Sequence, residues 1–320
     1  MPRVREDITN GLARVVSLAG LFSLAGTAVG QLGGSSWWGC ELACHFTLYY
    51  ALALAPATVL HLAPTRFRRA KLGYACAGGL LLNLALLAPL YWPTTEPAPG
   101  KSLRVMSLNV LTSNSRYDDV LRLVDNEDPD VLVLMEINQA WATAMAPLAG
   151  RYGAVKVDPR SDNFGMALYT RLPVAGMEII EIAESRTPTI AAELLLSGQG
   201  VSVLATHPLP PTSAAYAGSR DRQLAEAAKW AAARSEPTIL LGDLNVTRFS
   251  PRFRSLLRRS GLNDSAVGHG YRATWYVGRL IGLPIDQVLY SDALAVVDRR
   301  IGPGVGSDHR AVIVDFTLRE

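Results

Sequence analysis

The chain has 320 residues, of which 49% are apolar and 18% are charged. This length exceeds that of one small domain, and the apolar content excludes an intrinsically disordered chain. Residues 1–100 hold seven of the 31 basic and four of the 28 acidic residues, so the remainder carries 24 of each. The net charge of +3 therefore comes from the first hundred residues, and the balanced remainder lacks the bulk charge signature of a nucleic-acid-binding protein.

Three apolar stretches occupy residues 12–32, 40–63 and 72–92. Each is long enough to span a membrane, because roughly 20 helical residues cross the hydrocarbon core. Their apolar residues cover every face, and a cleaved signal peptide would account for the first stretch alone. We therefore expect residues 1–92 to form a membrane anchor with three transmembrane helices. All three cysteines lie in this part, so the rest of the chain can form neither an internal disulfide nor a thiolate zinc site.

The loop at residues 33–39 has no basic residue. The basic residues instead flank the first stretch (Arg3, Arg5 and Arg14) and fill the loop after the second (Arg66, Arg68, Arg69 and Lys71). The positive-inside rule then places the N-terminus in the cytoplasm and, after an odd number of spans, everything beyond Trp92 outside it. This arrangement suits an integral protein of a bacterial inner membrane. Residues 93–100 contain three prolines and predict a short, stiff linker.

From residue 101 onward the pattern predicts a strand-rich α/β domain. Two helical patterns, at residues 116–126 and 220–234, lie among eight β-rich runs: 103–110, 131–137, 165–170, 191–196, 201–206, 238–241, 285–290 and 311–318. Polar residues stand at the ends of several runs, where folds of this kind place their sites.

Glu136 follows the buried run at residues 131–135. A carboxylate has no role in such a strand unless a cation meets it, so we predict a ligand for Mg²⁺ or Mn²⁺. The alternative is a salt bridge at the strand end. A metal ion suits the chemistry of a phosphoester, whose hydrolysis needs charge neutralised and a water oriented.

Asp243 and Asn245 are two residues apart, so after an extended run their side chains point to the same side. Asp243 is suited to orient or deprotonate a water, and the Asn245 amide to donate to a phosphoryl oxygen. The alternative is an ordinary turn, since Gly-Asp-Leu-Asn is also good turn chemistry.

The Ser307-Asp308-His309 segment joins a potential metal ligand to an imidazole that can donate to a transition-state oxygen. Asp286 is the candidate carboxylate that fixes the tautomer of this imidazole. His207 precedes Pro208 and is presented at a strand edge, with a purely structural histidine as the alternative.

Taken in order, these motifs resemble the endonuclease/exonuclease/phosphatase superfamily, with its DNase-I-like fold, over residues 101–320: Ser107-Leu108-Asn109, Pro129-Asp130-Val131 through Glu136, Thr206-His207, Gly242-Asp243-Leu244-Asn245, Ile285-Asp286 and Ser307-Asp308-His309. The resemblance implies a four-layered α/β sandwich of two mostly antiparallel sheets with helices outside. It is nearest to the membrane-tethered bacterial branch, for which residues 273–275 and 283–286 are typical.

The resemblance also implies a role for each site residue. Metal binding falls to Glu136, Asn109 and Asp308. For catalysis, the resemblance implies that Asp243 activates water beside Asn245, that Asp286 orients His309, and that His207 makes a second phosphate contact. Substrate contacts are implied for Asn163 and for Arg220, with Arg222 as an alternative to Arg220. Leu111 stands where abasic-site endonucleases of the superfamily have an acidic residue, which disfavours that repair activity.

The shared core does not select a substrate, so accessory loops must do so. Residues 275–284 are apolar with one cation, and such a loop can dip into a bilayer or pack on its own domain. Our leading hypothesis is a membrane-anchored, Mg²⁺- or Mn²⁺-dependent phosphoesterase that cleaves a phosphodiester or phosphomonoester, such as a lipid headgroup, at the outer membrane face.

Two alternatives remain. The first is an extracytoplasmic endonuclease or exonuclease, with a phosphate track formed by Arg248, Arg252, Arg254, Arg258 and Arg259, although the same spacing suits a surface helix. The second is a non-catalytic, membrane-tethered binding domain, against which the presence of every expected catalytic group argues.

Overall fold

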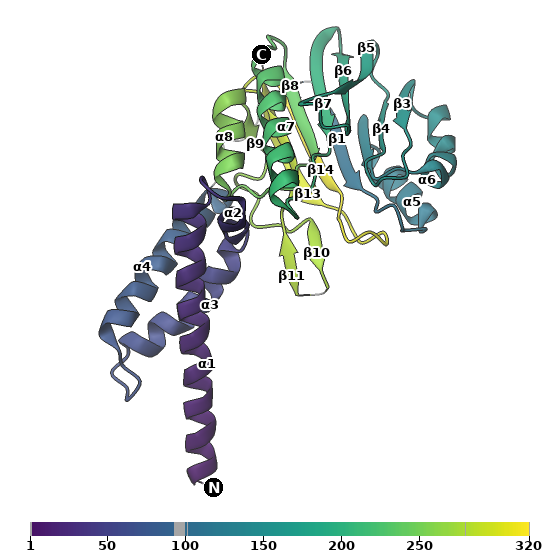
Figure 1. Cartoon of the computed structure of the whole chain (residues 1–320). Helices are drawn as coiled ribbons and strands as arrows, with labels where there is room; N and C mark the ends of the chain where they lie inside the picture. Colours follow the sequence, from purple (N-terminus) through teal and green to yellow (C-terminus); the bar gives the residue numbers. More distant parts are fainter. Residues whose placement is uncertain (1, 93–99, 101, 279, 320) are drawn as a thin grey trace. The chain divides into compact units, whose positions relative to one another are not determined.

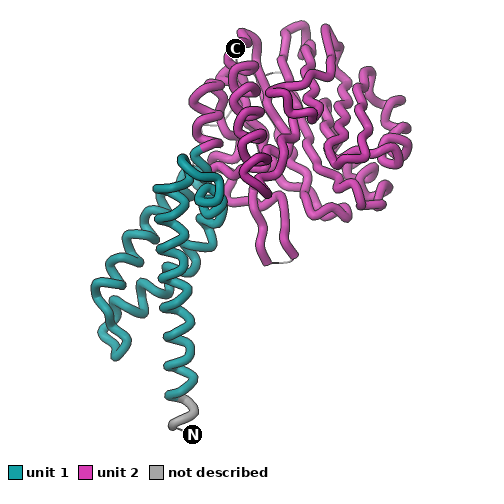
Figure 2. Tube along the Cα trace, in the orientation of Figure 1, with its two compact units in different colours: residues 1–92, 249–251 teal, residues 93–248, 252–320 magenta. Residues whose placement is uncertain are grey.

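Residues 2–92, 100, 102–278 and 280–319 are described by the computed structural model (Figure 1). The chain divides into Met1–Trp92 with Phe249–Pro251, here the helical unit, and Pro93–Arg248 with Arg252–Glu320, here the sandwich unit (Figure 2). Apart from Gly100, the predicted linker at residues 93–100 lies outside the described residues.

Closely packed helices form the helical unit. A Cβ atom added to Gly20 would lie 2.5 Å from the Cβ of Ala57, so the lack of a side chain there lets two helices approach. Asn83 donates to the Thr27 hydroxyl at 2.9 Å and links the first and last long helices. The elements are α1 (Pro2–Ala28), η1 (Val29–Gly33), α2 (Trp38–Cys44), α3 (Thr47–Leu62), α4 (Ala70–Leu87) and η2 (Ala88–Tyr91).

Within the described residues, Glu6–Gly33 and Ala70–Tyr91 are helical segments long and apolar enough to cross a membrane. The middle predicted stretch forms α2 and α3, which pass the same test together but are bent by 63°. At the bend the Thr47 hydroxyl donates to the Cys44 carbonyl at 2.9 Å. Length and composition therefore give two spans, or three if the bent pair crosses as one.

Two six-stranded sheets make up the sandwich unit. The first has the order β13-β14-β1-β2-β4-β3, in which β1 and β2 are parallel and the other neighbours antiparallel. Its strands are β1 (Ser102–Asn109), β2 (Val131–Met135), β3 (Ala154–Asp158), β4 (Met166–Thr170), β13 (Leu294–Ile301) and β14 (Val312–Leu318).

The second sheet has the order β5-β6-β7-β8-β12-β9, and β7 and β8 are its parallel pair. A separate hairpin pairs β10 with β11. The strands are β5 (Val174–Glu181), β6 (Pro188–Leu196), β7 (Gln199–Thr206), β8 (Thr238–Asp243), β9 (Asn263–Asp264), β10 (Trp275–Val277), β11 (Ile281–Leu283) and β12 (Asp286–Tyr290).

Three apolar clusters set the layers. One lies between the sheets and contains Val133 from the first and Val203 from the second. The others join each sheet to helices on its outer face, one around Trp141 and one around Phe253. The helices are α5 (Tyr117–Glu127), α6 (Gln139–Ala144), η3 (Ala146–Gly150), α7 (Ala214–Ala232) and α8 (Pro251–Ser260). The expected α/β fold with two packed sheets and outer helices is confirmed.

Each of the eight predicted β-rich runs coincides with a strand, within a few residues at the ends. The second predicted helix begins earlier than expected, because the Ser213 side chain caps α7 by accepting from the Tyr216 amide at 3.2 Å.

Candidate active site

The predicted catalytic side chains meet at one end of the two sheets, which we call the site end. The parallel strands β1 and β2 both end there, at Asn109 and Met135, as do β7 and β8, at Thr206 and Asp243. The strands β12 and β14 run the opposite way and begin there. Residues far apart in sequence are thereby brought to one place.

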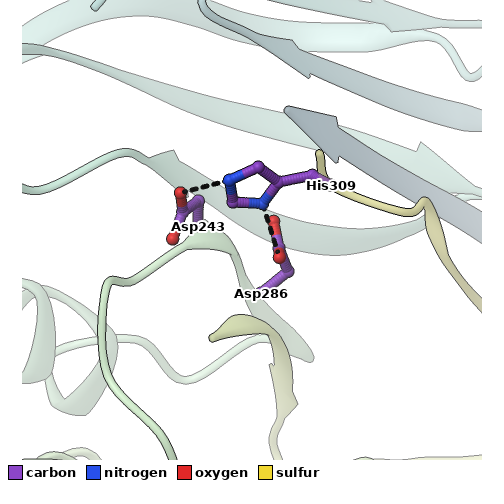
Figure 3. A group of neighbouring side chains, drawn as sticks. All are labelled: Asp243, Asp286 and His309. Carbon is purple, nitrogen blue, oxygen red and sulfur yellow. Dashed lines mark hydrogen bonds and ion pairs between the residues drawn. The ribbon is translucent and has the colours of Figure 1, made fainter. Parts of the chain in front are cut away.

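Asp243, Asp286 and His309 form a buried group (Figure 3). His309 Nδ1 lies 2.9 Å from Asp286 Oδ2, and His309 Nε2 lies 3.6 Å from Asp243 Oδ2. Within the described residues this is the one group of three potential His, Cys, Asp or Glu ligands close enough to share a metal ion. However, His309 Nδ1 and Asp286 Oδ2 already hydrogen-bond to each other, so these two atoms are engaged within the protein.

Burial and the neighbouring charges shift the pKa values of all three residues in this group. Burial lowers the pKa of His309, but the carboxylates of Asp286 and Asp243 outweigh burial and raise it to about 10. Burial raises the pKa of Asp243, but His309 and His207 outweigh it, and the pKa falls below its usual range. The pKa of Asp286 is raised, chiefly by burial. Near neutral pH the imidazolium of His309 therefore carries both N–H groups, one of them directed at Asp286, beside an ionised Asp243.

His207 also faces Asp243, with its Nε2 atom 3.5 Å from Oδ2. Its ring packs against Phe164, with the centroids 5.2 Å apart. The ends of β7 and β8 approach each other closely at Gly242, because a Cβ atom there would lie 2.0 Å from the Thr206 carbonyl oxygen. Gly242 also has φ +142, a conformation that residues with side chains rarely adopt.

Asn245 lies in a turn, and its donation to a phosphoryl oxygen stays a prediction. Its amide N–H donates to Asp243 Oδ1 at 3.0 Å, and its φ of +51 marks a turn. Its side-chain nitrogen donates one hydrogen to the Pro208 carbonyl at 3.0 Å. A second hydrogen on that nitrogen remains for another acceptor.

Glu136 turns back over the end of β2 with φ +62. Its Oε1 atom accepts from Asn109 Nδ2 at 2.9 Å, and its Oε2 atom accepts from the Thr112 amide at 3.1 Å. Asn109 Nδ2 also lies 3.3 Å from Asp243 Oδ2 and so joins the two carboxylates. In the described part of the chain no ion pair involves Glu136, so the strand-end salt bridge is not formed there.

Asp308 lies on a loop that Ser307 attaches to β1. The Ser307 hydroxyl donates to the Asn109 carbonyl at 2.8 Å and accepts from the His309 amide at 3.0 Å. Asp308 Oδ2 accepts from the Trp275 indole at 2.9 Å, whereas its buried Oδ1 atom has no hydrogen-bond partner among the described residues. A buried, unpartnered carboxylate oxygen suits a hard cation, so Asp308 has the chemistry expected of a ligand for Mg²⁺ or Mn²⁺.

The two predicted substrate contacts differ in exposure. Asn163 is exposed, has φ +67 and directly precedes Phe164. Arg220 is fully buried and donates to the Asn245 carbonyl at 3.2 Å and to Asp221. These two contacts of Arg220 are with the protein itself, and its contact with substrate stays a prediction.

Thr274 and Trp275, noted in the sequence only within a segment typical of the membrane-tethered branch, are two further neighbours of the site. The Thr274 hydroxyl accepts from the Ile285 and Asp286 amides at 3.2 and 3.1 Å, and Trp275 holds Asp308. Both residues open the apolar segment before Asp286, where a single sequence does not distinguish a hydrogen-bond donor from a packing residue.

Solved structures with the same architecture cover about two thirds of this chain. The human nocturnin catalytic domain with bound sulfate is 21% identical, with a TM-score of 0.57, and the match covers 70% of this chain and 97% of that one. Zebrafish (D. rerio) TDP2 complexed with single-strand DNA product is 18% identical, with a TM-score of 0.58 and 68% and 99% covered. Sphingomyelinase C from Streptomyces griseocarneus is 18% identical, with a TM-score of 0.51 and again 68% and 99% covered. At these identities the likeness shows the fold.

A search of curated proteins gives no match. The sequence itself matches the endonuclease/exonuclease/phosphatase family over residues 106–309, which extend from β1 through the Ser307-Asp308-His309 segment. Members of this family are typically hydrolases of phosphoester bonds and commonly use divalent metals. The chain therefore belongs to the endonuclease/exonuclease/phosphatase family.

Proposed function

We propose that the sandwich unit hydrolyses a phosphoester with the help of a divalent cation held by Glu136, Asp308 and Asn109. The buried group of Asp243, Asp286 and His309 is the observation that supports this most directly, since it holds an ionised carboxylate beside an imidazolium. When bound, the cation would neutralise charge on the phosphoryl oxygens and polarise the phosphorus.

The protein side chains supply the remaining chemistry. Asp243 orients a water and takes its proton as the bond from the water oxygen to phosphorus forms and the bond from phosphorus to the leaving oxygen breaks. A carboxylate with a lowered pKa is a weak base, so orientation is its larger contribution. The free N–H of the Asn245 amide and the N–H of His309 donate to the phosphoryl oxygens as their charge grows, and Asp286 fixes the His309 ring. His207 contacts a second phosphoryl oxygen or the leaving oxygen.

We propose a lipid headgroup as the substrate. The β10–β11 hairpin adjoins Asp308 and exposes apolar side chains, with Leu280 89% and Val277 53% exposed. Apolar side chains on a loop are suited to enter the interfacial region of a bilayer. The similarity to a sphingomyelinase supports the same class of substrate.

The test uses the full-length protein in detergent with Mg²⁺ or Mn²⁺. Phospholipids in micelles and vesicles, a soluble nitrophenyl phosphodiester and monoester, and supercoiled plasmid form the substrate panel. We expect headgroup or phosphate release that EDTA and Asp243→Asn abolish. No release from any phospholipid would reject the lipid hypothesis.

The hairpin gives a sharper version of this test. Leu280→Ser is expected to lower turnover of vesicle lipid and to leave turnover of the soluble ester unchanged. Val297, 47% exposed on β13, offers a matched control, since Val297→Ser removes a similar apolar side chain away from the hairpin. Equal turnover of vesicles by the two variants would count against the hairpin as the lipid contact.

We further propose that the helical unit spans a bacterial inner membrane and that the sandwich unit lies outside the cytoplasm. The side depends on the bent pair α2 and α3, because two spans return the chain to the side of its N-terminus and three do not. A C-terminal reporter that is active only outside the cytoplasm tests this directly. An inactive reporter on an expressed protein would place the sandwich unit inside.

A nuclease is the second candidate, supported by the similarity to a structure described with a single-strand DNA product. Two arginines of the predicted phosphate track already pair with carboxylates, Arg248 with Asp264 at 3.1 Å and Arg252 with Asp221 at 2.9 Å. Phe253 and Leu256 are buried on α8, as expected for a surface helix. Plasmid nicking that Asp243→Asn abolishes would favour the nuclease, and no turnover together with no Mg²⁺-dependent stabilisation would favour a binding domain.

A further inference from the structure

Trp275 contacts the loop that carries Asp308 with both its side chain and its backbone. The indole Nε1 atom donates to Asp308 Oδ2 at 2.9 Å. The main chain beside it pairs with the same loop, since the Tyr276 amide donates to the Asp308 carbonyl at 3.0 Å and the Arg310 amide to the Thr274 carbonyl at 2.7 Å. These bonds place Trp275 opposite His309 in a short antiparallel bridge. Asp308 is thereby fixed at its backbone and at one carboxylate oxygen.

The two oxygens of this carboxylate have different surroundings. Oδ2 is held by the indole, whereas Oδ1 is buried and has no hydrogen-bond partner among the described residues. The donor is neutral, so the carboxylate keeps its full negative charge, which an arginine in the same place would offset. One rotamer of Asp308 is therefore selected, with a single oxygen open to a further cationic partner.

We propose that Trp275 is a positioning residue that orients Asp308 so that Oδ1 binds the divalent cation as a monodentate ligand. The proposal rests on the metal site of the proposed function and adds a residue outside its set of ligands. Donors that orient a ligand typically change metal affinity by roughly 10–100-fold when removed.

A packing role alone does not account for this geometry. Trp275 is only partly buried, and it is absent from the apolar clusters of the sandwich unit. Trp275→Phe keeps an aromatic ring at the site and removes the N–H. Without that donor, the Asp308 carboxylate is free to rotate and to expose either oxygen.

The experiment measures Mn²⁺ binding to the full-length protein in detergent by calorimetry and by tryptophan emission. We expect Trp275→Phe to weaken Mn²⁺ binding by at least about tenfold. We also expect most of the Mn²⁺-induced change in emission to disappear, because the indole lies one hydrogen bond from a ligand. The matched control is Trp230→Phe on α7, where the indole stacks with Arg234, and it should keep both the affinity and the emission change.

The outcomes separate this inference from the proposed function. A wild-type protein that binds no Mn²⁺ would overturn the metal site and the inference together. Wild-type binding with unchanged affinity in Trp275→Phe would overturn the inference alone. If Trp275→Phe fails to fold, the Mn²⁺ titration of Trp230→Phe still decides. If Mn²⁺ caused no change in the tryptophan emission of that variant, the Trp275 indole would lie away from the cation, and the inference would be overturned.

Discussion

At opposite ends of the sandwich unit, Asp315 and the two predicted metal-binding carboxylates, Glu136 and Asp308, have different surroundings. At the far end, where β1 begins and β14 finishes, Asp315 pairs with Arg104 at 2.6 Å and with Arg300 at 3.0 Å. Arg300 also pairs with Glu127 at 2.5 Å. At the site end, Glu136 and Asp308 accept hydrogen bonds from neutral N–H and O–H groups, and no arginine or lysine pairs with either of them in the described part of the chain.

This difference separates carboxylates that stabilise the fold from carboxylates that are available for chemistry. An arginine partner is always charged, so a carboxylate beside it is permanently neutralised. A carboxylate held by neutral donors keeps its negative charge and attracts an exchangeable cation. We therefore expect the charge of Asp315 to serve stability, and we propose that the charges of Glu136 and Asp308 serve the binding of a cation.

The largest expected effect comes from Asp243→Asn, which removes the group that we propose to orient and deprotonate the water. We expect turnover of the substrate identified in the panel to fall by roughly 10²–10⁴-fold, the range of a general base. The matched control is Asp315→Asn, which should keep at least half of the wild-type turnover. Comparable losses in the two variants would mean that the ends do not differ as described.

The pH dependence of stability is the second test. The pKa of His309 rises from its ordinary value of 6.5 to about 10 in the folded protein, so its charged form stabilises the fold below pH 6.5. This contribution is lost as the pH rises from 6.5 toward 10. We expect the free energy of unfolding of the metal-free protein to fall between pH 6.5 and 9.5, as measured by urea unfolding in EDTA. In Asp286→Asn the fall should be smaller, and equal slopes would contradict the pairing.

Metal binding at the site end should stabilise the folded protein, and this gain should depend on residues of the site end. Mg²⁺ at about 100 times its Kd is expected to raise the free energy of unfolding by about 2.7 kcal/mol. Glu136→Gln should lose most of this gain, whereas Asp315→Asn should keep it. A gain of equal size in Glu136→Gln would remove Glu136 from the ligand set.

The smallest effect is expected at the far end. Burial raises the pKa of Asp315, but Arg104 and Arg300 outweigh it and lower the pKa below its ordinary 3.8. The carboxylate therefore stabilises the fold above pH 3.8, and this contribution is lost as the pH falls through the folded value. We expect Asp315→Asn to cost roughly 1–3 kcal/mol of unfolding free energy at pH 7 and less in acid. An undiminished cost in acid would point to a cause other than charge pairing.

The sequence predicted the buried strands well and the edge strands poorly. Residues 131–135 form a continuous apolar run because both faces of β2 are covered. The edge strand β5 shows no regular alternation, since only some of its residues are half-buried and the others are exposed. An edge strand pairs with a neighbour on one side only, and its faces are only partly buried. Its sequence therefore lacks the apolar pattern that identifies a buried strand.

The sequence was enough to predict which residues at strand ends form the candidate site, but not most of the contacts between them. The pairing of His309 with Asp286 could be proposed because both follow recognisable motifs. The bond from Trp275 to Asp308 depends on the register between a hairpin and a loop 33 residues apart, which a single sequence does not contain. The burial of Arg220 against the Asn245 carbonyl likewise depends on where α7 packs.

Glu136, directly after β2, and Asn245, two residues after β8, both adopt left-handed backbone conformations. Such a conformation costs a residue with a side chain roughly 1–2 kcal/mol, and glycine avoids this cost. A laboratory selection for heat resistance alone would therefore favour glycine at residue 136 and discard the carboxylate. For engineers, a rise in melting temperature at this position would be a warning of lost activity, so any stability screen of this protein needs a second filter for turnover.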